Sequence, residues 1–412
     1  MKHIERPRYL NKLIDRMGNG YIKIITGIRR CGKSYMLGTI FRDYLLSHGV
    51  EDDHIIDIAL DDWANRELRN PEACYEYVKG KLGSGQYYLF IDEVQLMDQF
   101  EDVLNGFLHI DNLDVYVTGS NSQFLSSDVI SRFRDRGDAI RMHPLSFAEY
   151  YAAAGGDWDD AWQDYITFGG MPRLLSFEDD GDKIDYLKNL FSETYLRDIV
   201  ERYKIRNEPE LEELVRISAS AMGSLTNPDK LERSFKSTKG VDLSSKTIKK
   251  YLGYLQDAFI LSNALQYNIK GKRYISTPSK YYFEDLGLRN SILGFRQQEE
   301  THLMENAIYN ELVMRGYSVD VGVVEITEGG VRKKVEIDFI ANRGSQRYYL
   351  QSAYALSSEE KILQETLPLV SVRDSFKKIV RVGGSSKPAR DENVIVSMGI
   401  KQFMLDSNSL DF

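Results

Sequence analysis

The chain lacks the features that mark secreted, membrane-spanning or strongly basic proteins. It has only two cysteines in 412 residues, Cys31 and Cys74, which excludes a disulfide framework and favours a reducing compartment. No apolar run approaches the roughly 18 residues of a membrane span, and residues 1–7 have no signal-peptide core. The net charge of −9 argues against binding nucleic acid or anionic lipid through overall charge. We therefore expect a cytoplasmic protein with no membrane partner.

What the chain does have is length and an ordinary globular composition. Its 412 residues allow about two or three domains, each with its own core. Hydrophobic residues make up 42% and charged residues 28%, which is typical of a folded α/β protein.

One stretch carries a phosphate-binding pattern. An apolar run at 21–26 leads into a loop of the form G-x-x-x-x-G-K-[ST], and a helix-forming segment follows. The glycines let backbone N–H groups turn toward phosphate oxygens, and the start of the helix adds its positive end. Lys33 is expected to contact the β- and γ-phosphates, and Ser34 to ligate Mg²⁺. The predicted nucleotide-binding residues are Gly27, Ile28, Arg29, Arg30, Cys31, Gly32, Lys33, Ser34 and Tyr35.

A second apolar run, residues 87–91, ends in the acidic pair Asp92-Glu93. Behind a phosphate loop, such a pair predicts that Asp92 holds Mg²⁺ and that Glu93 orients and deprotonates the attacking water. The alternative is a strand that leaves the core with two solvated acids. An acid beside the Mg²⁺ ligand favours hydrolysis over phosphoryl transfer to a small molecule, because a kinase has to keep water out.

Two further polar segments are candidates for the same site. The strand-like run 114–118 leads to Ser120 and Asn121, and a polar side chain here senses the γ-phosphate in similar P-loop proteins. Asn121 and Ser120 are the candidates, and we assign the role to Asn121, with an ordinary polar turn as the alternative. Residues 132–136 contain three arginines, of which Arg136 is the candidate to act on a γ-phosphate, in cis or from a neighbouring subunit of a homo-oligomer. The alternative is a solvated basic turn.

The order of elements predicts an α/β fold, with a parallel sheet covered by helices on both faces. The phosphate loop, the Asp92-Glu93 pair and Asn121 each follow a strand, so we expect them to meet at the carboxyl edge of that sheet. The expected strands are 21–26, 55–60, 87–91, 114–118 and 139–142. The expected domains are 1–150 (P-loop ATPase), 151–206 (helical lid), 207–295 (winged helix–turn–helix) and 296–412 (restriction-endonuclease-like).

The third part reads as three helices and a hairpin around Lys270-Gly271-Lys272, the elements of a winged helix. Residues 230–250 hold seven basic and two acidic side chains, a net of +5, which favours contact with double-stranded DNA. The alternative is a module that binds only protein.

The fourth part resembles restriction-endonuclease-like nucleases, in which a helix acid, an Asp and an E/Q-x-K triplet hold metal. Glu305, Asp338 and Gln351 match, but Ala353 occupies the lysine position, so nuclease activity is not expected. The strand-like runs are 317–325, 334–341, 348–354, 378–382, 394–398 and 401–405.

Motifs along nearly the whole chain resemble a prokaryotic family of AAA-type P-loop ATPases with a C-terminal domain of unknown function, of the DUF4143 type. The resemblance implies an AAA/ASCE-like sheet, ATP and Mg²⁺ as cofactors, and Arg136 as the functional arginine, although Asp135 replaces the family's glycine beside it. The matching segments are 27–34, 91–95, 118–120, 144–147, 169–172, 285–289, 303–306 and 336–339.

These observations favour a Mg²⁺-dependent ATPase whose cycle acts on its C-terminal half. The alternatives are a nucleotide-switched module with little turnover and, less favoured because of Ala353, an ATP-dependent nuclease. GTP is disfavoured, since no base-reading N-K-x-D motif follows the phosphate loop.

Overall fold

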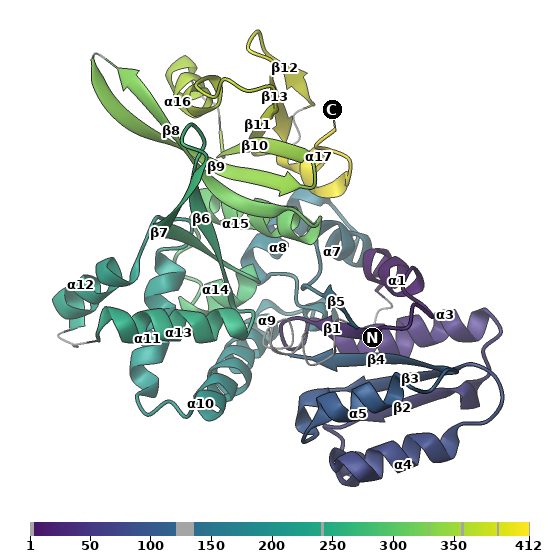
Figure 1. Cartoon of the computed structure of the whole chain (residues 1–412). Coiled ribbons are helices and arrows are strands. Elements are labelled where there is room, and N and C mark those ends of the chain that lie inside the picture. The colour runs from purple at the N-terminus through teal and green to yellow at the C-terminus, as the bar shows by residue number, and fades with distance from the viewer. Residues whose placement is uncertain are drawn as a thin grey trace. The chain divides into compact units, whose positions relative to one another are not determined.

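Residues 4–120, 136–239, 243–328, 330–355, 358–384 and 387–411 are described by a computed structural model (Figure 1). The chain forms two compact units: the first comprises 1–145, 171–176 and 257–259, and the second comprises 146–170, 177–256 and 260–412. Within the described residues, every helix is too short or too polar to cross a membrane.

The first unit is built on a five-stranded parallel sheet in the order β2-β3-β4-β1-β5. Strand β4 lies between the strand before the phosphate loop and the acidic strand, as the sequence predicted. The strands are β1 (Ile22–Thr26), β2 (Ile55–Ala59), β3 (Tyr87–Asp92), β4 (Leu113–Gly119) and β5 (Gly137–Arg141). The helices are α1 (Pro7–Ile14), α2 (Lys33–Tyr35), which continues through a π-helical stretch (Met36–Phe41) into α3 (Arg42–Ser47), α4 (Pro71–Lys81) and α5 (Phe100–Phe107). The expected α/β fold is thus confirmed for this part of the chain.

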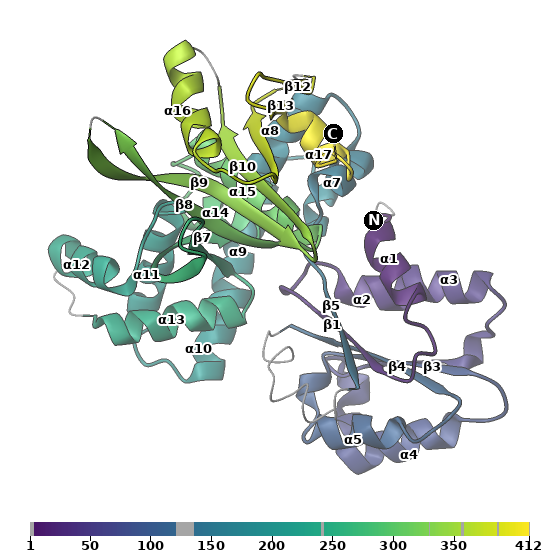
Figure 2. The same cartoon turned by 45° about the horizontal axis from the view of Figure 1, so that its top comes forward.

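Helices cover both faces of this sheet, because its strands are apolar on both sides. Helices α1 and α3 lie on one side, and α4 and α5 on the other (Figure 1, Figure 2). Leu89 and Ile91 of β3 belong to the core cluster beneath α4 and α5. Phe90 points to the opposite face, where Phe41 packs with its ring centroid 5.8 Å from that of Phe90 and 4.9 Å from that of Tyr116.

The second unit begins with helices, as expected for the helical part at 151–206. Residues 180–203 are helical throughout, with a π-helical stretch (Leu190–Leu196) between α9 and α10. The helices are α7 (Phe147–Ala154), α8 (Trp158–Phe168), α9 (Asp180–Asn189), α10 (Arg197–Tyr203), α11 (Glu208–Ser220), α12 (Pro228–Lys239), α13 (Ser245–Asp257), α14 (Leu286–Ile292), α15 (Glu300–Met314), α16 (Glu359–Val370) and α17 (Ile400–Leu405).

The strands of the second unit form one mixed sheet in the order β12-β13-β11-β10-β9-β8-β6-β7. The hairpin predicted around Gly271 exists as β6 and β7, and β6 pairs in parallel with β8. The expected wing and the expected nuclease-like strands therefore share a single sheet. The strands are β6 (Leu261–Asn268), β7 (Arg273–Phe283), β8 (Ser318–Glu328), β9 (Val331–Arg343), β10 (Gln346–Ala353), β11 (Lys377–Val382), β12 (Ala389–Arg390) and β13 (Ile395–Gly399).

One predicted strand is wrong: residues 401–405 belong to helix α17. Its buried residues are Ile400, Phe403 and Met404, whose spacing of three and four is that of one helix face. A short apolar run does not distinguish a strand from a helix, and here the helical period holds.

Candidate nucleotide site

The phosphate loop needs glycine for the shape of its backbone. Gly27 has φ of +147° and Gly32 has φ of +103°, both in the region that favours glycine. A Cβ on Gly27 would lie 2.0 Å from the carbonyl oxygen of Met142. The N–H of Met142 donates to the carbonyl of Thr26 at 2.7 Å, so the loop begins against the residue that follows β5. Any larger residue at position 27 would displace this contact.

Lys33 is folded back onto its own loop. Its side chain is buried, and Nζ donates to the carbonyl oxygens of Gly27 at 3.0 Å and Ile28 at 3.3 Å. The ammonium group is thus held beside the first residues of the glycine-rich turn, at the start of helix α2. A lysine in this place puts a positive charge where the loop presents its N–H groups.

A buried arginine, Arg6, holds the loop through hydrogen bonds to backbone carbonyls. The sequence motifs did not reveal it. Arg6 donates to the carbonyl oxygens of Cys31 at 3.1 Å and His143 at 2.9 Å, and it also contacts Pro144. Because charge-assisted bonds to carbonyls are strong when buried, Arg6 ties the loop to the segment after β5. It precedes Cys31 by 25 residues and belongs to no motif.

Strand pleating carries Asp92 to the loop. Asp92 has the same parity in β3 as Phe90, so it points to the face that holds the loop helix rather than to α4 and α5. The Ser34 hydroxyl donates to Asp92 Oδ2 at 2.7 Å, and the Thr118 hydroxyl donates to Oδ1. Burial raises the pKa of Asp92; these two hydrogen bonds oppose the shift, and the negative charges of Glu93 and Asp61 add to it.

Glu93 sits beside this pair in an unusual backbone conformation. Its φ is +51°, in the left-handed region, and its N–H donates to Thr118 Oγ1 at 3.0 Å. Its carboxylate accepts hydrogen bonds from the Gln95 amide and, at 3.3 Å, from the Ser120 hydroxyl. Arg29 Nε in turn donates to Ser120 Oγ at 3.3 Å. The structure thus links the loop, the acidic strand and the end of β4 through Ser120; Thr118 and Gln95 were not singled out from sequence.

Of the two remaining candidates, Asn121 lies outside the described residues. The carbonyl oxygen of Arg136 accepts the N–H of Ile22 at 2.9 Å, so Arg136 sits at the start of β1 and β5. The phosphate loop follows the opposite end of β1, about 16 Å away at roughly 3.3 Å per residue. The structure therefore does not bring Arg136 together with Lys33 in the same unit.

The donor set suits a magnesium ion and a nucleotide. The hydroxyl of Ser34 and the carboxylate of Asp92 lie 2.7 Å apart, and both are oxygen ligands of the kind that Mg²⁺ prefers. The positive φ angles of Gly27 and Gly32 give the loop beside this pair the backbone shape of a phosphate cradle. A hard cation at this point would also offset the charge repulsion between Asp92 and Glu93.

The predicted C-terminal trio is partly brought together on the large sheet. Glu305 of α15 and Asp338 of β9 both contact the ammonium of Lys280, at 2.9 and 3.3 Å. Gln351 of β10 accepts the N–H of Asp338 at 3.3 Å. Ala353, at the expected lysine position, is buried in the sheet's core cluster.

The basic segment lies on two exposed helix faces. Leu231, Phe235 and Ile248 are buried, so α12 and α13 are amphipathic. The described basic side chains on the opposite faces are exposed: Lys230, Arg233, Lys236, Lys246, Lys249 and Lys250.

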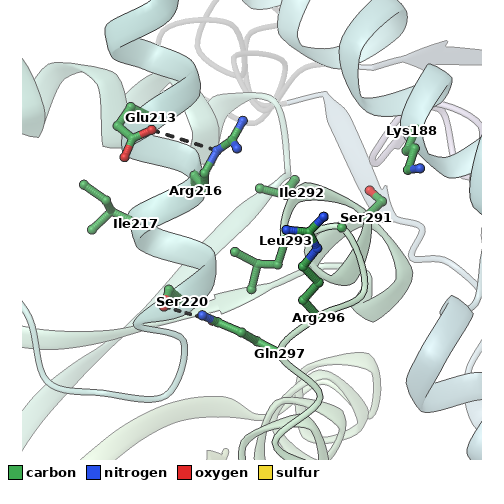
Figure 3. A pocket seen from close by; sticks show the side chains of 11 residues that line it. Lys188, Glu213, Arg216, Ile217, Ser220, Ser291, Ile292, Leu293, Arg296 and Gln297 are labelled. Carbon is green, nitrogen blue, oxygen red and sulfur yellow. Dashed lines mark hydrogen bonds and ion pairs between the residues drawn. The ribbon is translucent and has the colours of Figure 1, made fainter. Parts of the chain in front are cut away.

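A pocket of about 680 Å³ lies elsewhere in the second unit, between α11 and the end of α14 (Figure 3). Its lining includes the cationic side chains of Lys188, Arg216 and Arg296. The acidic side chain in the lining is Glu213, whose carboxylate lies 3.9 Å from the guanidinium of Arg216. This charge balance favours anions, but the lining contains no set of metal ligands.

The comparisons with known proteins agree with the fold of the first unit. Residues 19–151 match a family described as AAA domain, and residues 159–299 match a domain of unknown function, DUF8612. The parallel sheet and its phosphate loop lie within the first match, so residues 19–151 form an AAA domain. The second match is to DUF8612, and the finer DUF4143 assignment stays a prediction.

An uncharacterized protein of Haemophilus influenzae is 32% identical over 387 residues, which cover 92% of this chain and 93% of its own. The chain belongs to the family of this protein. Uncharacterized protein MJ1544 of Methanocaldococcus jannaschii is 28% identical over 358 residues, covering 82% of this chain and 76% of its own.

Among solved structures, the Aeropyrum pernix ORC1 protein in complex with DNA is similar at a TM-score of 0.30 and 12% identity. The match covers 71% of this chain and 93% of that chain. A likeness at this level carries no argument about function.

Proposed function

We propose that the protein is an ATP-binding, Mg²⁺-dependent ATPase that hydrolyses the phosphoanhydride bond. The observation that carries the proposal is the 2.7 Å hydrogen bond from the Ser34 hydroxyl to Asp92, which joins the phosphate loop to an acidic strand 58 residues further on. A hydroxyl and a carboxylate in contact beside a phosphate loop are the protein's share of a magnesium–triphosphate site.

Each residue then has a distinct task. The loop N–H groups and Lys33 bind the phosphates, while Ser34 and Asp92 hold Mg²⁺, which when bound neutralises charge on the phosphate oxygens. Glu93 accepts a proton from the attacking water, and its bonds from Gln95 and Ser120 orient the carboxylate for that step.

The test is Glu93→Gln, with Asp98→Asn as the matched control. Both substitutions exchange an acid for its amide, and Asp98 is exposed five residues further along. Hydrolysis should fall about 100-fold or more in Glu93→Gln while ATP binding persists, because the amide cannot accept the proton. Asp98→Asn should leave both unchanged. Wild-type turnover in Glu93→Gln would remove Glu93 from the mechanism.

Asn121 and Arg136 complete the proposed site. We assign Asn121 to the γ-phosphate or the attacking water. Arg136 is proposed to act in trans, from a neighbouring subunit of a homo-oligomer, since its backbone is at the far end of β1 from the loop. Mixed oligomers of Arg136→Ala and Lys33→Ala subunits should regain turnover if this is so, because the Arg136→Ala subunit keeps Lys33 in its own site and receives Arg136 from its Lys33→Ala neighbour.

The C-terminal half is proposed to be what the ATP cycle acts on. We retain the winged helix at 207–295 and the nuclease-like domain at 296–412 as proposals, with 151–206 as a lid beside the ATPase domain at 1–150. Coupling is measured as the change in affinity for double-stranded DNA between the ATP-bound, ADP-bound and nucleotide-free protein.

A second candidate function is a nucleotide-controlled module that binds double-stranded DNA with little turnover. It is favoured by the exposed basic faces of α12 and α13. Replacing Lys246, Lys249 and Lys250 by Ala should weaken DNA binding and lower the slope of log affinity against log salt by up to about 3, if each contacts a phosphate. The control replaces the exposed Lys79 and Lys81 of α4. ATP hydrolysis that is stimulated by DNA favours the ATPase. DNA binding without ATP hydrolysis favours the nucleotide-controlled module.

A further inference from the structure

The nuclease-like resemblance implies a divalent cation between Glu305 and Asp338, and the structure allows a test of whether these residues fit one. Both carboxylates are buried. Two buried acids close together are stable only when a cation or hydrogen-bond donors compensate them. The question is therefore which group compensates them in this chain.

The compensating group is an ammonium. Lys280 Nζ lies 2.9 Å from Glu305 Oε1, 2.6 Å from Glu336 Oε1 and 3.3 Å from Asp338 Oδ1. Lys280 comes from β7, whereas its partners come from α15 and β9. The lysine is 4% exposed and Glu305 and Asp338 are buried, whereas Glu336 is half-buried at the edge of the group. We call Lys280, Glu305, Glu336 and Asp338 the lysine cage.

The number of bonds matches the chemistry of the group. An ammonium has three N–H donors and no acceptor, and three carboxylates surround it. Burial opposes the charge on Lys280, but the three carboxylates outweigh it and raise its pKa. The lysine therefore stays protonated in the cage.

Two of the carboxylates have further hydrogen bonds. Asp338 Oδ2 accepts the N–H of Ser352 at 2.9 Å, and Glu305 Oε1, which also contacts Lys280, accepts the Tyr282 hydroxyl at 2.7 Å. The predicted ligand Gln351 is engaged on both sides of its amide, because Oε1 accepts the N–H of Asp338 at 3.3 Å and Nε2 donates to Glu365 at 3.1 Å. A magnesium ion needs oxygen ligands at about 2.0–2.1 Å, and the ammonium already occupies the point where the three carboxylates converge.

We propose that Lys280 takes the place of a divalent cation in the C-terminal carboxylate cluster, which makes the cluster a metal-free site locked by its own lysine. Lys280 does not replace the lysine missing at position 353 as a catalytic group beside a metal. Instead, the ammonium of Lys280 is itself the cation of the cluster, and it joins β7 to α15 and β9. Removing the ammonium should therefore create a cation site where the wild-type chain has none.

The experiment compares wild type, Lys280→Met and the double variant Lys280→Met/Asp338→Asn, without nucleotide and at pH 8. Two readouts follow the site: Tb³⁺ emission sensitised by Tyr282, whose hydroxyl contacts Glu305, and the rise in melting temperature with Mn²⁺. Lys280→Met should bind Tb³⁺ about tenfold or more tightly than wild type and be stabilised by Mn²⁺, and the double variant should lose both gains.

Background binding does not affect this comparison. The Ser34–Asp92 pair and the exposed group Glu51, Asp53 and His54 are the same in all three chains. If Lys280→Met is too unstable to purify, Lys280→Met/Glu305→Gln removes one negative charge and keeps Glu336 and Asp338. It should still gain Mn²⁺-dependent stability over the wild type.

Three results would overturn the proposal. One is saturable binding of Tb³⁺ to wild type that Asp338→Asn abolishes. Another is the absence of any metal-dependent gain in both lysine variants. The third is Mn²⁺-dependent DNA cleavage by wild type that Lys280→Met abolishes, which would make Lys280 a catalytic lysine. Because no nucleotide is present, none of these outcomes depends on whether the protein is an ATPase.

Discussion

Thr118 Oγ1 is shared by the two acids at the end of β3: its hydroxyl donates to the carboxylate of Asp92, the last residue of the strand, and its oxygen accepts the N–H of Glu93 at 3.0 Å. One side chain of β4 thereby orients the proposed magnesium ligand and the backbone that places the proposed base. Thr118 is fully buried at the carboxyl end of its strand, so water does not replace it easily.

This relationship predicts that Thr118→Val lowers turnover while ATP still binds. Valine keeps the shape but neither donates nor accepts, so Asp92 and Glu93 lose a common support. We expect turnover to fall about 10–100-fold, with a higher Mg²⁺ requirement, and Thr118→Ser to recover most of both because the hydroxyl returns. The measurement is steady-state hydrolysis across a Mg²⁺ titration. Equal losses in the valine and serine variants would point to packing instead of the hydrogen bonds.

Glu305 predicts a pH dependence of stability. Burial, together with the charge of Asp338, raises its pKa to about 7 in spite of Lys280 and the Tyr282 hydroxyl. A folded-state pKa above the unfolded value means that the folded chain holds the proton more tightly, so this contribution is full below about 4.5 and is lost as pH rises through 7. The loss amounts to about 3 kcal/mol.

Urea unfolding from pH 4.5 to 8 tests this in wild type and Glu305→Gln. Wild type should lose stability with rising pH relative to the variant, since glutamine does not titrate. Asp285, whose pKa burial raises to about 6, is present in both chains and cancels in the difference. Parallel curves for the two proteins would contradict the assignment.

Much of the first unit could be predicted because its signals are local. A loop with two glycines at fixed spacing specifies backbone angles that few other residues adopt, and Gly27 and Gly32 have them. The parity of Asp92 follows from the strand period alone. These features need no knowledge of distant residues, which is why the parallel order of the sheet and the meeting of Ser34 with Asp92 could be expected.

What the sequence did not reveal depends on partners far apart in the chain. Arg6 contacts His143, 137 residues further along the chain, and Lys280 contacts Asp338, 58 residues further along. Neither Arg6 nor Lys280 belongs to a motif. Residues 401–405 were misassigned because five residues are too few to separate the periods of strand and helix. The hairpin of β6 and β7 was taken as a free wing, since no local pattern shows that β6 pairs with β8.

Arg381 is a second buried cation, and it differs from Lys280 in its polar contacts. Its side chain is fully buried in β11, and none of its three guanidinium nitrogens has a hydrogen-bond partner in the described part of the chain. The guanidinium lies over the ring of Phe403 at 4.2 Å, and Arg315 lies over the same ring at 4.6 Å. Burial, with the nearby positive charge of Arg315, lowers the pKa of Arg381. Contact with one ring offsets only part of the cost of burying a guanidinium.

We therefore predict that Arg381→Met stabilises the protein by about 1–3 kcal/mol, because methionine fills a similar volume without a charge to desolvate. The matched control is Arg315→Met, which should destabilise the protein, since Arg315 Nε donates to the buried Glu311 at 2.7 Å and the substitution removes this ion pair. Urea midpoints of the two variants against wild type measure both effects. If Arg381→Met proved as destabilising as Arg315→Met, the guanidinium would have to be bound by a buried anion or water, and adding chloride or phosphate would then stabilise wild type but not the variant.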